Sequence, residues 1–248
     1  MDESIRHAIT KLASLHAVAA DEFARRVLQL GEPADRVYVV GTLSLDAMAA
    51  TPLLTRGALC EDLGLAPEGS FLVLTWHPET NSCDYGLSGL AAILAALDRR
   101  PEFQVVITAP NADPGSSAVR AAIGAWASRN PERARSVENL GTRRYWSAVA
   151  EASAVIGNSS SGLIEAPQLA TPTVNVGSRQ DGRPRAPSVI DCEARADAVD
   201  AALTRALSEA HLTRTRERRS PYGGPGAAER IVAIVRTASL DALRVKPF

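Results

Sequence analysis

Short apolar runs alternate with longer amphipathic segments along most of this chain, and this alternation constrains the fold more than any other feature. Each run is rich in Val, Ile or Leu, which is typical of strands that are covered on both faces of a parallel sheet. The predicted strands are residues 16–19, 36–40, 70–75, 103–108, 136–139, 154–156 and 173–176. The order of strands and helices predicts an α/β fold with a doubly wound, Rossmann-like parallel sheet.

Helices are predicted between the strands, where apolar residues recur at helical spacing. Pro167 is expected to limit one of them. Residues 214–226 are basic and then rich in Gly and Pro, which indicates an exposed loop before a last helix. The predicted helices are residues 4–14, 21–30, 90–98, 118–128, 146–152, 162–168, 194–208 and 227–238.

Composition excludes several classes of protein. The net charge of −1 gives no general attraction to nucleic acid or to an anionic membrane surface. Three cysteines, Cys60, Cys83 and Cys192, are far apart without CxxC spacing, so we expect neither a disulfide framework nor a metal site. The chain shows neither a signal peptide nor an apolar run of membrane-spanning length, and the expected location is the cytoplasm.

The most informative stretch runs from Val155 to Glu165, where a buried strand meets a hydroxyl-rich turn and a helix begins. Helix N-termini present unpaired N–H groups and a partial positive charge, so the turn with Ser159 and Ser160 suits a phosphate. A simple serine cap of the helix is the alternative. Glu165, in the first turns of that helix, could accept hydrogen bonds from ribose hydroxyls, or it could simply be an acid favoured by the helix dipole.

Three further strands end in polar loops. Arg179 lies in a Gly- and Pro-containing loop after residues 173–176 and is a candidate for binding an anion, although a solvated loop would have the same composition. His77 follows the strand at 70–75, and Asn111 follows the strand at 103–108. A lone histidine is usually structural or merely exposed. The carboxyl ends of parallel strands share one edge, however, so we expect these residues and the serine turn to converge on one crevice.

The motifs that carry this chemistry resemble those of UDP-N-acetylglucosamine 2-epimerases in order and approximate spacing. They are the RHAITKL segment at residues 6–12 with His16, the pair His77-Pro78, the segment at 110–113, Gly157-Asn158-Ser159-Ser160 with Glu165, and the segment at 179–183. The opening segment and the His-Pro form are similar to the hydrolysing, UDP-releasing branch. The resemblance covers nearly the whole chain.

This resemblance implies the C-terminal half of a two-domain, glycosyltransferase-B-like fold that holds UDP and needs no cofactor. By position it implies substrate contacts for His77 and Asn111, diphosphate contacts for Ser159 and Ser160, a ribose contact for Glu165 and a UDP contact for Arg179. It also implies a catalytic role for His77. The implied partner is a UDP-sugar substrate.

The same resemblance implies a domain division. Residues 1–41 are interpreted as a remnant of the N-terminal domain, 42–226 as the UDP-binding Rossmann-like domain, and 227–248 as a closing helix that would pack on the N-terminal domain. The family's acid and base residues lie in that first domain, so we expect either a homo-oligomer or a separately encoded N-terminal half. Asp2 and Glu3 lie near a family acidic stretch, but neither is assigned a role.

The implied reaction converts UDP-N-acetylglucosamine and water to N-acetylmannosamine and UDP in sialic-acid-type metabolism. The C2 proton is removed, UDP leaves C1, and water adds to the glycal-like intermediate with inversion at C2. Two alternatives stay open: a glycosyltransferase of the same fold, since fold does not fix function, and a catalytically inactive UDP-sugar-binding fragment.

Overall fold

The chain forms two compact units, which are residues Met1–Ala50 with Pro221–Phe248, and residues Thr51–Ser220. The computed structural model describes residues 2–246, with the side chains of residues 4–246. We call the two parts the terminal unit and the central unit. The domain division drawn from the family resemblance has its boundaries after residues 41 and 226 and stays a prediction.

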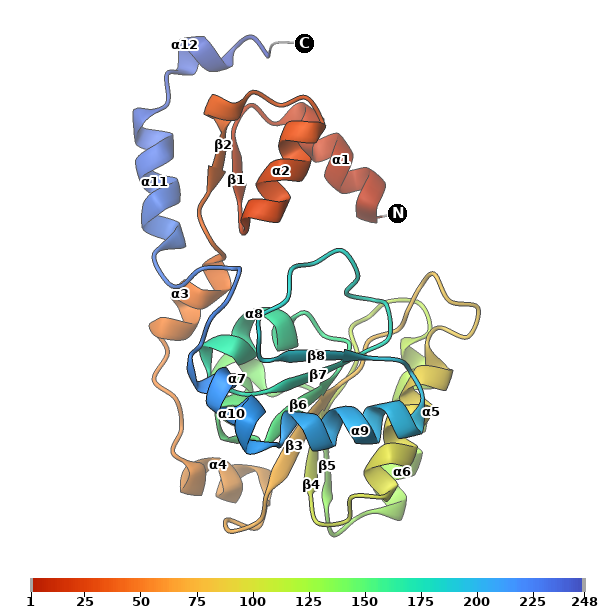
Figure 1. The fold of residues 1–248 in the computed structure, drawn as a ribbon. Coiled ribbons are helices and arrows are strands. Elements are labelled where there is room, and N and C mark those ends of the chain that lie inside the picture. The colour runs from red at the N-terminus through yellow and green to blue at the C-terminus, as the bar shows by residue number, and fades with distance from the viewer. Residues whose placement is uncertain (1, 247–248) are drawn as a thin grey trace. The chain divides into compact units, whose positions relative to one another are not determined.

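The central unit is built on a six-stranded sheet in which all pairs of neighbouring strands are parallel (Figure 1). The order in space is β5-β4-β3-β6-β7-β8, so the sheet grows in both directions from β3 and β6. This topology confirms the predicted doubly wound α/β fold. The strands are β3 (Phe71–Thr75), β4 (Gln104–Thr108), β5 (Ala134–Val137), β6 (Ala154–Gly157), β7 (Thr173–Val176) and β8 (Val189–Cys192).

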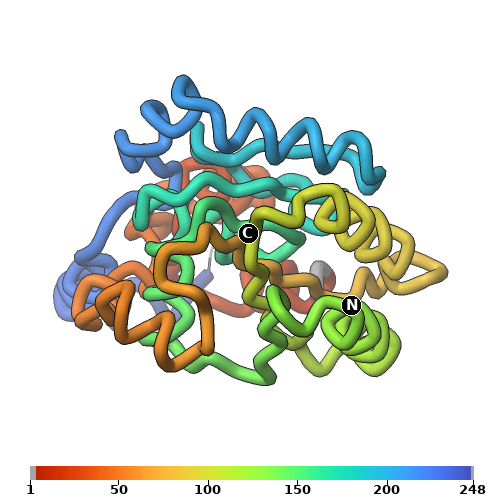
Figure 2. Tube along the Cα trace, turned by 90° about the horizontal axis from the view of Figure 1, so that it is seen from below, coloured from red at the N-terminus to blue at the C-terminus, as the bar shows by residue number. Residues whose placement is uncertain are grey.

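Helices cover both faces of this sheet, because successive residues of a buried strand point to opposite sides. Leu72 and Leu74 of β3 pack with α5, α6 and α9, whereas Phe71 and Val73 pack with α4, α7 and α8. In Figure 2, α5 in yellow and α9 in blue lie side by side, in agreement with their direct contact. The helices are α4 (Arg56–Leu63), α5 (Leu87–Asp98), α6 (Ser116–Arg129), α7 (Gly141–Glu151), α8 (Ser161–Gln168), α9 (Ala196–Ala206) and α10 (Glu209–Arg216).

The terminal unit combines the first and last segments of the chain. Its strands β1 (His16–Val18) and β2 (Val37–Val39) form a parallel pair. Asp46 of α3 accepts hydrogen bonds from the N–H groups of Gly226, Ala227 and Ala228, which caps the N-terminus of α11. The helices are α1 (Asp2–Leu12), α2 (Asp21–Gln29), the 3₁₀ turn η1 (Ala34–Arg36), α3 (Leu43–Ala49), α11 (Ala227–Thr237) and α12 (Leu240–Leu243).

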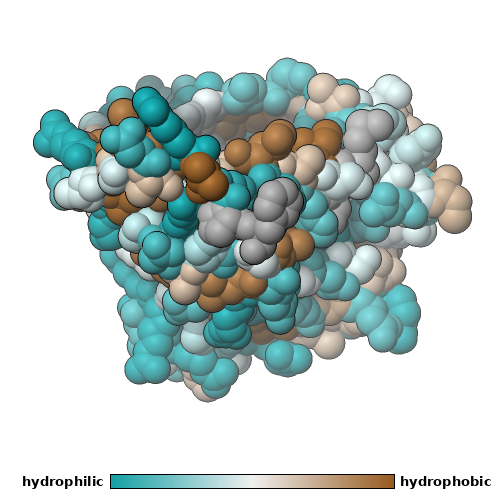
Figure 3. All heavy atoms as spheres, turned by 90° about the horizontal axis from the view of Figure 1, so that it is seen from above, coloured by the Kyte–Doolittle hydropathy of each residue, from teal (hydrophilic) through white to brown (hydrophobic). Residues whose placement is uncertain are grey.

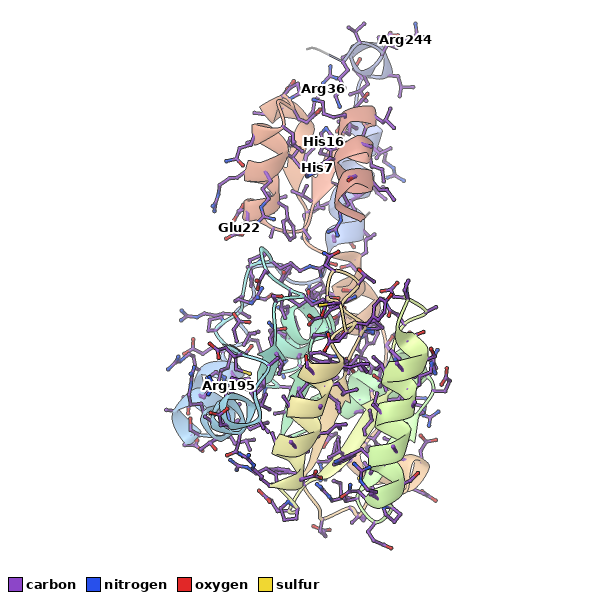
Figure 4. The ribbon with its side chains drawn as sticks, turned by 90° about the vertical axis from the view of Figure 1, so that its right-hand side faces the viewer. His7, His16, Glu22, Arg36, Arg195 and Arg244 are labelled. Atoms are coloured by element: carbon purple, nitrogen blue, oxygen red, sulfur yellow. The ribbon has the colours of Figure 1, made fainter. Side chains whose placement is uncertain are left out.

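A buried carboxylate ties these segments together. Glu32 lies 2.7 Å from the ammonium groups of both Lys11 and Lys246, and 3.0 Å from Nε2 of His16. Burial by itself raises the pKa of Glu32, but the hydrogen bonds from these three groups outweigh it and lower the pKa to about 2. Lys246 also donates to the backbone oxygens of Thr10, Lys11 and Ala13 at the end of α1. Figure 4 labels His16 of this cluster.

The terminal unit also exposes large apolar side chains. Ile5, Ile9 and Leu12 of α1 and Val235 of α11 are each more than half exposed. Figure 3 shows apolar side chains, in brown, between hydrophilic ones on one face of the molecule.

Several elements differ from their predictions. The predicted loop at 214–226 is wrong at its start, because α10 extends to Arg216 and buries Thr215. The fifth strand begins two residues earlier than predicted, at Ala134, and α7 begins at Gly141 instead of residue 146. Helix α8 runs through Pro167 but ends one residue later. Strand β8 and helices α3, α4, α10 and α12 were not predicted; β8 is an edge strand that buries only Ile190.

Candidate functional site

The predicted site residues lie on loops that follow four adjacent strands. In the order β4-β3-β6-β7, these loops carry Asn111, then His77, then the turn with Ser159 and Ser160, and then Arg179. Because the strands are parallel, all four loops leave the same edge of the sheet. We call the residues His77, Asn111, Asn158, Ser159, Ser160 and Arg179 the strand-end site.

Asn158 joins the loop after β3 to the loop after β6. Its side chain is fully buried and makes two hydrogen bonds to the backbone of His77. The amide oxygen of Asn158 accepts from the His77 N–H at 2.7 Å, and the amide nitrogen donates to the His77 carbonyl at 2.8 Å. The Asn158 backbone carbonyl accepts from Arg179 at 3.3 Å and from the Gln180 side chain at 2.7 Å. One residue therefore fixes both His77 and the loop after β7.

The imidazole of His77 is held in one tautomer. The backbone N–H of Asn111 donates to Nδ1 of His77 at 3.1 Å, so Nδ1 is the acceptor and the proton of the neutral ring is on Nε2. Burial lowers the pKa of His77 to about 4; the charge of Arg179 adds to this effect and that of Asp113 opposes it. At neutral pH His77 is therefore a neutral hydrogen-bond donor through Nε2, without a free lone pair to act as a base.

Gly157 precedes the serine turn and could not be another residue. Its φ is +135°, and a Cβ atom there would lie 2.0 Å from the carbonyl oxygen of Thr75. After this close approach the chain turns into α8, with Ser160 as the N-cap residue. Among the described residues, the N–H groups of Ser159 and Ser160 donate to no protein acceptor. The turn is therefore able to donate hydrogen bonds to an anion.

A polar layer lies beneath this turn. The hydroxyl groups of Thr75 and Thr108 are 2.8 Å apart at the ends of β3 and β4. Burial raises the pKa of Tyr145, while the neighbouring side chains of Ser161 and Thr75 oppose this effect and the charge of Glu165 adds to it. Tyr145 thus lies close to Ser161, the first residue of α8, and near the half-buried Glu165.

Some buried polar atoms of the site have no protein partner within the described part of the chain. They include the amide oxygens of Asn111 and Gln180 and the hydroxyl oxygen of Ser161. Such atoms are costly to bury unless water or a ligand pairs with them. Both amide oxygens are acceptors, which suit the hydroxyl groups of a ligand.

The structure brings together His77, Asn111, Arg179 and the serine turn, as the parallel topology predicts. Sequence reasoning missed the roles of Asn158, Gln180 and Tyr145. Asn158 lies inside the Gly-Asn-Ser-Ser motif, which indicated that it belongs to the site. Its hydrogen bonds to the distant loop with His77 could not be predicted from the sequence. A neighbouring hollow of about 570 Å³ beside Gly177 and Ser178 is lined by the acidic residues Asp181, Asp191 and Glu193.

No cluster of three or more His, Cys, Asp or Glu side chains in residues 4–246 could hold a metal ion. Within the same part of the chain, no helix is both long and apolar enough to cross a membrane.

Comparisons with known proteins agree on one family. A model of the family described as UDP-N-acetylglucosamine 2-epimerase matches residues 1–236. The chain is 33% identical over 193 residues to the GDP/UDP-N,N'-diacetylbacillosamine 2-epimerase (hydrolyzing) of Campylobacter jejuni. This match covers 78% of this chain and 50% of that protein. It is 30% identical to the UDP-N,N'-diacetylbacillosamine 2-epimerase (hydrolyzing) of Legionella pneumophila, over 97% of this chain and 62% of that protein.

Solved structures agree with the fold. The UDP-GlcNAc 2-epimerase of Neisseria meningitidis, bound to UDP-GlcNAc, superimposes with a TM-score of 0.75 at 18% identity over 92% of this chain and 63% of that one. The MnaA–UDP co-structure of S. aureus gives 0.73 at 20% identity, over 96% and 63%. The predicted α/β fold with a parallel sheet, of the kind found in glycosyltransferase-B-like proteins, is confirmed. The chain spans about half to three fifths of the length of its curated relatives.

Proposed function

Because this chain belongs to the UDP-N-acetylglucosamine 2-epimerase family, we propose that its strand-end site binds the UDP part of a UDP-linked acetamido sugar. The observation that carries the proposal is the convergence of neutral His77, Arg179 and the serine turn at the ends of three adjacent strands. The proposed activity is that of the hydrolysing branch, which forms N-acetylmannosamine and UDP from UDP-N-acetylglucosamine and water. The metabolic context is sialic-acid-type sugar synthesis.

The diphosphate is assigned to the turn at Ser159 and Ser160. The N-terminus of α8 and the guanidinium of Arg179 supply positive potential there, and the two serines supply N–H and hydroxyl donors. As the bond between C1 and the departing oxygen breaks, negative charge grows on the β-phosphate. Donors that are already in place stabilise this charge without reorganisation. His77 adds a neutral donor through Nε2, and Asn111 holds its ring by the hydrogen bond to Nδ1.

His77 is assigned to the leaving group and not to the C2 proton. Its Nδ1 is occupied by the Asn111 N–H, and its pKa of about 4 makes it a weak base. Removing the C2 proton, and returning one to C2 from the opposite face, requires groups whose pKa suits both steps. Carboxylates are the side chains expected in that role. The side chains of Asp2 and Glu3, which the sequence places near a family acidic stretch, lie outside the described residues.

Glu165 is assigned to the ribose. Its carboxylate would accept hydrogen bonds from the 2′- and 3′-hydroxyl groups, so Glu165→Ala should weaken UDP while leaving inorganic diphosphate unchanged. Hydrogen bonds to charged groups contribute about 1.5–3 kcal/mol each, which predicts a loss of at least tenfold in affinity for UDP. Calorimetry with both ligands measures this, and an equal loss for UDP and diphosphate would disprove the ribose assignment.

The proposed function is tested by calorimetry of the purified chain with UDP and by following UDP release from UDP-N-acetylglucosamine. UDP binding that His77→Ala and Arg179→Ala both weaken supports the site. No UDP binding at millimolar ligand refutes it. Binding without turnover supports the UDP-binding role and identifies the chain tested as insufficient for the reaction. The proposed assembly, a homo-oligomer or a complex with a separately encoded N-terminal half, is tested by the mass of the particle in solution.

A further inference from the structure

The loop from His77 to Gly86 lies between β3 and α5 and is organised by hydrogen bonds of its own. Asp84 accepts hydrogen bonds from the Ser82 hydroxyl at 2.6 Å and from the N–H groups of Gly86 and Ser88, each at 2.9 Å. These bonds lower the pKa of Asp84. The N–H of Glu79 donates to the carbonyl of Tyr85 at 3.0 Å and closes the loop on itself. The positions of Glu79 and Tyr85 are therefore fixed relative to each other.

Tyr85 is held in an unfavourable backbone conformation and is partly exposed. Its φ is +54°, in the left-handed region that a bulky residue rarely adopts, and the residue is 41% exposed. Its side chain lies against Gly115, where a Cβ atom would come within 2.6 Å of Cβ and Cγ of Tyr85. Strain of this kind persists where the surroundings fix it and is concentrated at functional sites.

The side chain of Glu79 extends along the same edge of the sheet toward β7, whereas Tyr85 lies against the loop after β4. Its Cγ lies 3.1 Å from the Cβ position of Gly86, and its Oε1 lies 3.1 Å from the Cβ position of Gly177, which follows β7. Since β6 separates β3 from β7, the carboxylate reaches across the end of β6, where the serine turn begins. No hydrogen bond or ion pair within the described residues satisfies this carboxylate.

We propose that Glu79 and Tyr85 recognise the sugar ring of the UDP-sugar, an inference that rests on the proposed function. The sugar is joined to the β-phosphate, so a diphosphate on the serine turn places the sugar beside this loop. A carboxylate accepts paired hydrogen bonds from two neighbouring sugar hydroxyls, and an aromatic face packs on the apolar C–H face of a pyranose. The ligand class is a nucleotide sugar with adjacent free hydroxyls.

Glu79 should also favour binding of the substrate, a UDP-sugar, over binding of the product UDP. The terminal phosphate of free UDP carries one more ionisable oxygen than the esterified phosphate of a UDP-sugar, and a carboxylate across the end of β6 repels the additional charge. Removing the charge of Glu79 should therefore weaken UDP-N-acetylglucosamine and leave UDP equal or tighter. A purely structural role for Glu79 would weaken both ligands together.

The test is calorimetry with UDP and UDP-N-acetylglucosamine on wild type, Glu79→Gln and Glu132→Gln, the last being an exposed glutamate elsewhere in the central unit as control. Glu79→Gln is expected to weaken the UDP-sugar about tenfold or more, with UDP unchanged or tighter, and the control to match wild type. Equal weakening of both ligands, or an unchanged ratio of the two affinities, overturns this inference but leaves the proposed function in place. Absence of UDP binding by wild type refutes the proposed function and, with it, this inference.

Tyr85→Gly gives an independent check that does not depend on Glu79. Glycine adopts φ of +54° without strain, so the melting temperature should not fall, whereas affinity for the UDP-sugar should drop several-fold and affinity for UDP should hold. A fall in melting temperature with no change in the ratio of the two affinities would show that the ring serves the loop's structure, and would overturn its assignment to the sugar.

Discussion

Replacing Asn158 with alanine tests whether one buried side chain holds the strand-end site together. The substitution leaves the His77 N–H and carbonyl without the partners that now lie at 2.7 and 2.8 Å. Each unpaired buried polar group costs about 1–3 kcal/mol. The expected loss is about 2–6 kcal/mol, a large part of the 5–15 kcal/mol that is usual for a whole domain.

Urea unfolding followed by tryptophan fluorescence measures this loss in the relevant part of the molecule. All three tryptophans, Trp76, Trp126 and Trp146, lie in the central unit. With a denaturant slope of about 2 kcal/mol/M, a loss of about 3 kcal/mol lowers the urea midpoint by about 1.5 M. The exposed Asn81, on the His77 loop, provides the control, since Asn81→Ala removes an amide without these bonds.

Asn158→Asp refines the test. The carboxylate keeps the acceptor for the His77 N–H but turns an oxygen toward the His77 carbonyl. At neutral pH, Asn158→Asp should therefore lower the urea midpoint as much as Asn158→Ala does. At acid pH, where the carboxylate is protonated, the loss should be smaller. A midpoint for Asn158→Ala within about 0.3 M of wild type, or equal to that of Asn81→Ala, would refute the reasoning that Asn158 secures the site.

Three other predictions follow from particular groups. The folded pKa of His77 is lowered to about 4 from 6.5, so its contribution to stability is present above pH 6.5 and is lost as the pH falls toward 4; histidine NMR titration should find this pKa and, if UDP binds, find it raised. Glu32 has a folded pKa of about 2 against 4.5, so Glu32→Gln should lower stability at pH 7 and flatten its decline between pH 4.5 and 2, measured by circular dichroism. Ala170 has φ of +57° after α8, so Ala170→Gly should raise the free energy of unfolding in urea by up to about 1 kcal/mol; a lower urea midpoint would contradict this.

The sequence was sufficient to predict the sheet and the side on which the site lies, because buried parallel strands are compact apolar runs and their carboxyl ends share an edge. It was sufficient for His77, Asn111 and Arg179 to be placed on neighbouring loops. Their roles as contacts to UDP stay proposals.

Other features depend on contacts between distant segments and were not predictable. The tautomer of His77 is set by the backbone of Asn111, 34 residues away along the chain, and the clamp by Asn158 spans 81 residues. Helix α10 has few apolar residues to give a periodic signal. Its N-cap residue Ser208 accepts a hydrogen bond from the N–H of His211. A serine at this position is a sequence signal for the start of a helix, but the predicted helix at 194–208 extended up to it instead.

The bonds from Lys246 to Glu32 and to the end of α1 have a consequence for the order in which the protein becomes structured during synthesis. Residues 4–50 leave the ribosome long before residues 221–246, which complete their packing. The central unit is continuous in the chain and can fold in the interval, as domains generally do during translation. Residues 4–50 therefore have to wait for residues 221–246, with part of their apolar surface uncovered. In this protein, residues that are made before the central unit reach their final structure only after it.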